Sequence, residues 1–108
     1  STCNSTNFFI IRDNEVWTST GQYCLNGVTR KSVIRLCKKY KIPVFEKNFT
    51  LKEVYKSKEV FVTGTFAGIT PVISVDNIVI GKGKRGTLTR NLQRWYNLEL
   101  ESMVLQNE

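Results

Sequence analysis

The hydrophobic positions at the start of the chain fall into two short runs separated by polar residues. Residues 7–11 (NFFII) and 16–18 (VWT) are rich in aromatic and β-branched side chains, which favour strands. Between them, Asp13 and Asn14 can supply the central pair of a tight turn. This pattern predicts that the chain opens with a β-hairpin.

The next hydrophobic pattern has a helical period. Apolar side chains recur three or four residues apart, with basic residues on the opposite side, at Val33, Ile34, Cys37 and Tyr40. The spacing predicts an amphipathic helix that begins near Gly27.

Shorter elements are expected in the middle of the chain. A β-type run at 42–45 precedes Thr50 and Glu53, which have the spacing of a capping box, so a short helix should begin there. Three of its side chains should face the core: Leu51, Val54 and Tyr55.

The last part of the chain predicts three more strands and a long helix. The strands are expected at 59–63, 70–75 and 78–80, with a tight turn at 76–77 between the last two. The helix should span 87–103, because apolar residues recur three or four apart at Leu88, Leu92, Trp95, Tyr96, Leu100 and Met103. The tail at 104–108 is expected to fray.

Length and composition limit the architecture. With 108 residues and 41% hydrophobic content, the chain fits one compact domain with one modest core. The predicted elements indicate an α+β fold, in which a mixed or antiparallel β-sheet, or a pseudo-barrel, is accompanied by about three helices.

Charge and hydropathy narrow the candidate partners. Sixteen Lys and Arg residues against nine Asp and Glu give a net charge of +7, so nucleic acid and an anionic small molecule are both candidates. The basic cluster at 82–85 has no interleaved aromatic residue, which argues against nucleic acid. No apolar run approaches the roughly 20 residues that cross a bilayer, so we expect a soluble, cytoplasmic protein with no membrane partner.

Residue types that are absent or rare exclude several kinds of catalysis. The chain has no histidine, which removes Ser-His and Cys-His arrangements and the usual general base. Its three cysteines lack C-x-x-C spacing, so we expect reduced thiols and no metal site.

A loop of small residues follows the strand that should end at Thr63. Gly64, Ala67 and Gly68 let a ligand approach the backbone, while Thr63 and Thr65 offer hydroxyls. Amides that point into one concavity favour an anion, commonly phosphate. A plain hairpin that uses the glycines for positive φ is the alternative.

A second glycine-rich segment, GKGKRG at 81–86, has the letters of the dinucleotide-binding fingerprint. The strand before it belongs to an antiparallel hairpin, and no acidic residue about 20 positions on lies at the end of a following strand. We therefore interpret 81–86 as a basic connector that leads into the last helix.

Three motifs occur in a fixed order along the chain. Asn7-x-Phe9 lies in the first strand, LNGVTR at 25–30 opens the first helix, and EVFVTGT at 59–65 is followed by TPV at 70–72. Together they resemble the C-terminal half of the class IV pyridoxal-phosphate aminotransferases, which include branched-chain and D-amino-acid transaminases and aminodeoxychorismate lyase. The resemblance covers nearly the whole chain and implies the fold of the C-terminal domain of D-amino-acid aminotransferase-like enzymes.

The resemblance implies a binding site for pyridoxal 5′-phosphate. The amides of Val28 and Thr29 match one half of the phosphate cup, and Thr65, next to Gly64, matches the other half through its hydroxyl and amide. Both positions agree with the general preference of helix N-termini and glycine-spaced loops for phosphate. Leu25 matches the aliphatic residue that packs on one face of the pyridine ring.

Further positions follow from the same resemblance. Phe66 and Ala67 match residues that line the substrate side, and Asn7, like Thr2 and Gly64, is expected to belong to the cofactor-binding site. The residue five before Asn7 is typically a glutamate that pairs with the pyridine nitrogen, whereas Thr2 stands there in this chain. Arg30 shares the family motif, but we expect a structural role in which its side chain satisfies nearby carbonyls or carboxylates.

The family's Schiff-base lysine lies well upstream of the Asn7-x-Phe9 strand, and no lysine of this chain matches it. The resemblance therefore implies that residues 1–108 are the C-terminal domain of a longer enzyme whose N-terminal domain is missing, and that the chain alone is catalytically incomplete. The whole enzyme would transfer an amino group between an amino acid and a 2-oxo acid, as a homodimer. The alternatives are an aminodeoxychorismate lyase-like enzyme and a non-catalytic basic domain that binds anions or nucleic acid.

Overall fold

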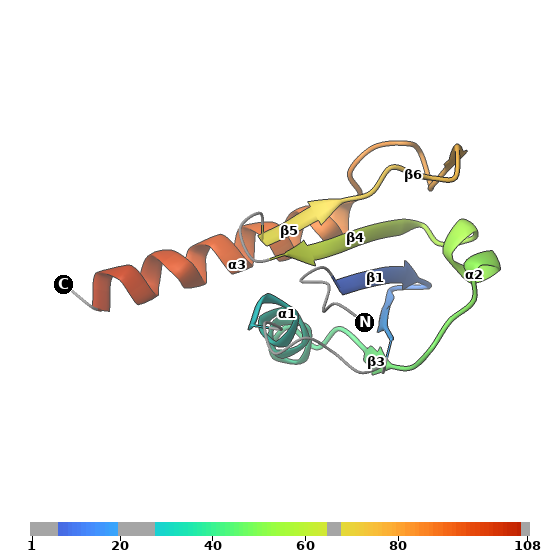
Figure 1. Cartoon of the computed structure of the whole chain (residues 1–108). Helices are drawn as coiled ribbons and strands as arrows, with labels where there is room; N and C mark the ends of the chain where they lie inside the picture. The colour runs from blue at the N-terminus through green and yellow to red at the C-terminus, as the bar shows by residue number, and fades with distance from the viewer. Residues whose placement is uncertain (1–6, 20–27, 65–67, 107–108) are drawn as a thin grey trace, which may run out of the picture.

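The computed structural model describes residues 7–19, 28–64 and 68–106 of the chain (Figure 1). The described elements follow one another as β1 (Asn7–Arg12), β2 (Glu15–Thr18), α1 (Val28–Lys39), β3 (Val44–Glu46), α2 (Leu51–Tyr55), β4 (Glu59–Gly64), β5 (Gly68–Pro71), β6 (Ser74–Val75), β7 (Ile78–Val79) and α3 (Thr87–Gln106). None of the helices described is long and apolar enough to cross a membrane.

The main sheet has five strands in the order β3-β2-β1-β4-β5. The β1·β2, β1·β4 and β4·β5 pairs are antiparallel, and β2 pairs with β3 in parallel, so the sheet is mixed. A separate hairpin is formed by β6 and β7. With the three helices, this arrangement confirms the predicted α+β fold.

Both predicted tight turns are confirmed. Asp13 and Asn14 have φ angles of 49° and 64°, and Asp76 and Asn77 have φ angles of 50° and 66°. Positive φ at both central positions is the turn geometry that matches the twist of two paired strands. Asp and Asn tolerate this region better than most other residues, so the turns follow from local sequence.

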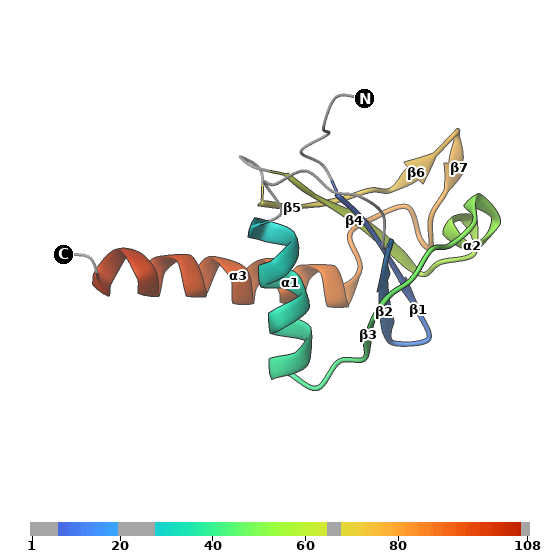
Figure 2. The same ribbon diagram turned by 60° about the horizontal axis from the view of Figure 1, so that its bottom comes forward.

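One face of the sheet carries α1 and α3, which cross each other on that side (Figure 2). Phe9 of β1 and Phe61 of β4 are cross-strand partners, fully buried, with stacked rings whose centroids lie 4.7 Å apart. Buried side chains of the two helices pack in the same cluster: Val33, Leu36, Cys37 and Leu92. This aromatic pair therefore anchors both helices, and truncating either ring to alanine would cost about 3–5 kcal/mol.

The opposite face is covered by α2 and by the chain that leads to α3. Ile10 and Val60 are buried there with Val54 of α2 and Ile80. The capping box is confirmed, because the Thr50 side chain accepts from the Glu53 amide and the Glu53 side chain accepts from the Thr50 amide. The predicted burial of Leu51 is wrong: it is 53% exposed, on the side of this short helix that faces solvent.

Two strand predictions had wrong boundaries. The strand expected at 42–45 is β3 at Val44–Glu46, because Ile42 takes part in the C-terminal cap that follows α1. The Ile42 amide donates to the Cys37 carbonyl at 2.7 Å, and Lys41 has φ 60°. The strand expected at 70–75 is divided into β5 and β6, because the chain leaves the sheet after Val72, whose amide still donates to β4.

The last helix is longer than predicted and ends beyond its packing partners. It extends to Gln106, so the tail expected to fray from 104 is helical up to that residue. Leu100 and Met103, which share the predicted apolar stripe, are 41% and 54% exposed. The reason is visible in Figure 1, where the C-terminal part of α3 extends past the sheet.

The outer edge of β5 is partly protected. Opposite residues of two antiparallel strands alternate between hydrogen-bonded pairs and pairs without hydrogen bonds. The Val72 amide donates to the Val60 carbonyl of β4 at 2.8 Å. The backbone of the preceding residue, Pro71, therefore points away from β4. Proline has no N–H to leave unpaired there. Two residues earlier, the Ile69 carbonyl also faces outward and accepts from Gln93 Nε2 of α3 at 2.8 Å.

Candidate functional site

The N-terminus of α1 lies against the end of β4. Thr29, in the first turn of α1, is buried, and its Oγ1 donates to the carbonyl oxygen of Gly64 at 3.4 Å. Gly64 is the last residue of β4 and leads into the segment that matches the second half of the phosphate cup. The two segments that were expected to share one ligand are therefore adjacent at Thr29 and Gly64, which lie 35 residues apart in the sequence.

The local chemistry fits an anion such as phosphate. The first turn of α1 has no acidic residue, so it brings no carboxylate of its own to the N–H groups that a helix start leaves unpaired. Those amides and the helix dipole favour negative charge. At Gly64, no described atom lies within 4 Å of the place where a Cβ would stand, so a ligand has room beside the backbone.

Asn7 and Thr63 lie at the same end of the sheet. They are cross-strand partners, and alternation along β4 puts Thr63 on the same face as Phe61, which is the face that carries α1. Thr63 is only 1% exposed, and its Oγ1 has no hydrogen-bond partner among the described residues. A buried hydroxyl without a partner costs about 1–3 kcal/mol, so a polar group bound at this end of the sheet would be favoured.

Arg30 has the structural role that was predicted for it. Its side chain is 8% exposed, and its Nη2 donates to the Ser19 carbonyl at 3.1 Å and to Glu46 Oε1 at 2.9 Å. These contacts fasten the start of α1 to the end of β2 and to β3. The guanidinium therefore fixes the start of the helix.

Several predicted site residues fall outside the part of the chain that the structure describes. These are Thr2, Leu25, Thr65, Phe66 and Ala67. Their roles remain those implied by the family resemblance.

The N-terminus of α3 differs from that of α1, because a carboxylate occupies it. Glu59 of β4 accepts from the amides of Leu88 and Thr89, at 3.3 and 2.8 Å. Gly86 leaves the space for this carboxylate, since a Cβ there would overlap the Glu59 side chain. The glycine-rich segment 81–86 thus has a structural purpose, which supports its interpretation as a connector.

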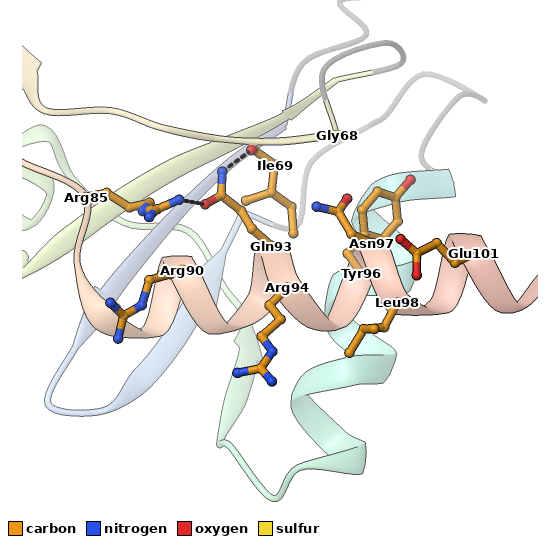
Figure 3. A pocket seen from close by; sticks show the side chains of 10 residues that line it. All are labelled: Gly68, Ile69, Arg85, Arg90, Gln93, Arg94, Tyr96, Asn97, Leu98 and Glu101. Carbon is orange, nitrogen blue, oxygen red and sulfur yellow. Dashed lines mark hydrogen bonds between the residues drawn. The ribbon is translucent and has the colours of Figure 1, made fainter.

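A groove of about 520 Å³ is lined by residues of β5 and α3 together with Arg85, and its wall contains residues that sequence reasoning missed (Figure 3). The Tyr96 hydroxyl lies 3.3 Å from Thr29 Oγ1, and its ring lies so close to Gly68 that a Cβ there would be 3.2 Å from Tyr96 Cε2. Gln93 accepts from Arg85 Nη1 at 2.9 Å and donates to β5. Helical spacing predicted only that Tyr96 faces inward; the sequence carries no signal for the strand end that it meets.

In the described ranges, the ionisable side chains offer neither a buried lysine amine nor a metal centre. Every lysine of the chain lies in the described residues and is exposed. Among the residues described, no group of three or more His, Cys, Asp or Glu side chains could hold a metal ion.

The sequence is similar to known aminotransferases. A family model described as "Amino-transferase class IV" matches residues 1–75. A D-alanine aminotransferase of Listeria monocytogenes is 38% identical over 99 residues, which are 91% of this chain and 34% of that protein. A branched-chain-amino-acid aminotransferase of Pseudomonas aeruginosa is 42% identical over 90 residues, 83% of this chain and 29% of that protein.

Solved structures give the same result. A T.th. branched-chain amino acid aminotransferase, complexed with N-(5′-phosphopyridoxyl)-L-glutamate, matches with a TM-score of 0.80 and 37% identity, over 85% of this chain and 31% of that one. A putative 4-amino-4-deoxychorismate lyase of Legionella pneumophila matches with a TM-score of 0.77 and 30% identity, over 89% of this chain and 35% of that one.

The chain spans about a third of the length of these relatives. The family match extends over more than half of the chain, and the sheet and three helices agree with the solved structures in fold. The chain therefore belongs to the class IV aminotransferase family.

Proposed function

We propose that this chain is the cofactor-binding C-terminal part of a pyridoxal-phosphate-dependent class IV aminotransferase, which transfers an amino group between an amino acid and a 2-oxo acid. The observation that carries the proposal is the contact between Thr29 and Gly64, which puts a helix N-terminus whose first turn has no acidic residue beside the end of β4. The T.th. relative, with its phosphopyridoxyl ligand, supports the choice of cofactor.

Each residue of the site has a role in this proposal. The amides of Val28 and Thr29, together with Thr65, hold the phosphate, and Leu25 covers one face of the ring. Phe66 and Ala67 border the substrate. When bound, pyridoxal phosphate supplies an electron-withdrawing ring that stabilises negative charge on the substrate.

Thr2 modifies this chemistry. A hydroxyl can hydrogen-bond to the pyridine nitrogen but cannot hold a counter-charge as a glutamate does, so the ring should be less electron-withdrawing. An ordinary protonated-ring spectrum together with ordinary transaminase rates in the complete enzyme would contradict this.

The chain alone should not catalyse transamination. A nucleophilic lysine needs desolvation or a neighbouring cation that lowers its pKa, and every lysine here is exposed. In this proposal, as the family resemblance implies, the covalent attachment point of the cofactor lies in an N-terminal domain of the enzyme, outside residues 1–108.

Assembly and location are proposed on the family resemblance, as a cytoplasmic homodimer. Exposed apolar side chains on the β6–β7 hairpin and on the end of α3 are consistent with further packing: Ile78, Val79, Leu98 and Met103. A specific alternative is a lyase outcome, which the similarity to the Legionella pneumophila protein favours.

The test measures binding of pyridoxamine 5′-phosphate and of pyridoxamine to the 108-residue chain by titration calorimetry. Neither compound has an aldehyde, so neither can react with the exposed lysines. We expect the phosphorylated compound to bind at least about tenfold more tightly, since amide contacts to an anion are charge-assisted. Thr29→Ala should weaken it, whereas Thr70→Ala, at an exposed threonine of β5, should not.

Three results would contradict the proposal in different ways. Equal affinity for pyridoxamine 5′-phosphate and pyridoxamine would contradict the proposed phosphate-binding site. Equal affinity for inorganic phosphate and for pyridoxamine 5′-phosphate would favour a non-catalytic anion-binding domain. Turnover of an amino donor and a 2-oxo acid by the chain, above that of free pyridoxal phosphate, would show that the chain is catalytically complete.

A further inference from the structure

Three groups from three different elements form a hydrogen-bonded chain at the start of α1. The carbonyl of Gly64 can only accept, so the single hydroxyl proton of Thr29 must point toward it. With that proton on Gly64, the Tyr96 hydroxyl, 3.3 Å from the same Thr29 oxygen, acts as the donor in the second contact. The hydrogen-bonded chain then runs from α3, through α1, to the end of β4.

The same part of α3 also contacts the start of β5. Gly68 has φ +65°, and the Tyr96 ring occupies the space that a side chain would need there. One turn earlier on α3, Gln93 donates to the Ile69 carbonyl at 2.8 Å. Figure 3 shows Gln93 reaching the Ile69 carbonyl and Tyr96 lying near Gly68. Gly64 and Gly68, the two ends of the connection between β4 and β5, are thus both held by way of Tyr96.

We propose that Tyr96 is a positioning residue for the phosphate site: its hydroxyl, through Thr29, and its ring, against Gly68, hold the first turn of α1 in register with the end of β4 and the start of β5. This inference rests on the proposed function. It has one specific consequence for the chemistry. Because the Thr29 proton is committed to Gly64, the phosphate is bound by the Thr29 backbone amide, and the Thr29 hydroxyl serves as a spacer between α1 and β4.

Tyr96→Phe removes the hydroxyl and keeps the ring, so it tests the role of the hydroxyl alone. Tyr40→Phe is the matched control. Tyr40 is also a tyrosine of the α1–α3 contact, where its ring stacks on Trp95 with centroids 3.8 Å apart, but it lies at the far end of α1 from the site. Both changes remove one hydroxyl and keep one aromatic ring, so only the connection to Thr29 differs.

Binding of pyridoxamine 5′-phosphate to the 108-residue chain should weaken by about 3- to 10-fold in Tyr96→Phe, as expected for one lost hydrogen bond. Binding of pyridoxamine should not change, because it lacks the phosphate. Tyr40→Phe should leave both affinities at the wild-type value. In amide NMR spectra without ligand, Tyr96→Phe should shift the signals of Thr29 and Gly64, and Tyr40→Phe should not.

The possible failures are distinguishable. If the wild-type chain prefers the phosphorylated compound and Tyr96→Phe keeps the full preference, the positioning role is overturned and the proposed function stands. If Tyr96→Phe weakens both compounds equally, Tyr96 acts only through general packing, and the inference is again overturned. If the wild-type chain does not prefer the phosphorylated compound, the proposed function fails. The hydrogen-bonded chain is tested separately: unchanged Thr29 and Gly64 amide signals in Tyr96→Phe would contradict it.

Discussion

The carboxylate of Glu59 at the start of α3 allows a quantitative test of the fold. It accepts from two backbone amides, so Glu59→Ala leaves both unpaired and removes a negative charge from a helix N-terminus. A lost cap costs about 1 kcal/mol, and the charge adds about 0.3–1 kcal/mol, which together give about 1–2 kcal/mol. For a domain of this size the midpoint of thermal unfolding should fall by about 5–15 °C.

Gly86 makes the test specific. An alanine there would displace the Glu59 side chain, because its Cβ would overlap the carboxylate, so Gly86→Ala should cost about as much as the lost cap. In the Glu59→Ala background that clash is gone. Gly86 is not among the glycines with positive φ, so the same substitution should then be neutral or stabilising by about 0.4–1 kcal/mol. The two changes should therefore show a coupling energy of about 1–2 kcal/mol.

The assay is urea and thermal unfolding of the four proteins, followed by circular dichroism. Gly83→Ala is the control substitution, because Gly83 has φ +72° and its strain should cost the same with or without Glu59. Glu101→Ala, at an exposed glutamate of α3, controls for the loss of charge. Additive effects of Gly86→Ala and Glu59→Ala would refute the account of this helix start.

Two other predictions concern the Cys37 thiol of α1 and the ion pair between Arg35 of α1 and Glu99 of α3. Burial raises the pKa of the Cys37 thiol to about 12, so at pH 8 it should resist alkylation in the native chain and react once urea unfolds it, as mapped by mass spectrometry. A hydrogen bond from Arg35 lowers the pKa of Glu99 below its usual value of 4.5, so this contact should stabilise the protein at neutral pH and lose its effect as the pH falls through the lowered pKa. Arg35→Gln should therefore show a weaker loss of thermal stability between pH 6 and pH 3 than the wild type, whereas equal losses would contradict the role of this pair.

The sequence was sufficient wherever structure depends on neighbouring residues. The Asp-Asn turns, the Thr50 capping box and the period of α1 all result from interactions within a few residues. All are confirmed except at Tyr40, which was expected on the apolar side of the helix but follows α1 and is 41% exposed. Predictions were wrong where packing partners decide. Met103 has the correct helical spacing but is 54% exposed, and Leu51 lies on the solvent side of a helix only five residues long.

The same contrast between local interactions and long-range packing applies to the candidate site. Local motifs identified Thr29 and Gly64 separately, and the family resemblance supplied the expectation that they meet. Tyr96 was predicted only as a packing residue, because its partner Thr29 lies 67 positions away and no periodicity reports such a distance. The predicted residues outside the described ranges remain untested.

The protection of the outer edge of β5 also affects how two molecules could associate. Strands with a free row of amides and carbonyls recruit strands from other chains, which is a common origin of aggregates. Here Pro71 lacks the amide that such pairing would use, and Gln93 already occupies the carbonyl of Ile69. Extension of the sheet by a strand of another chain is therefore hindered at this edge, and two copies should instead associate through side-chain surfaces. Because Gln93 protects this edge and Tyr96 contacts the candidate site, solubility and function both depend on the packing of α3.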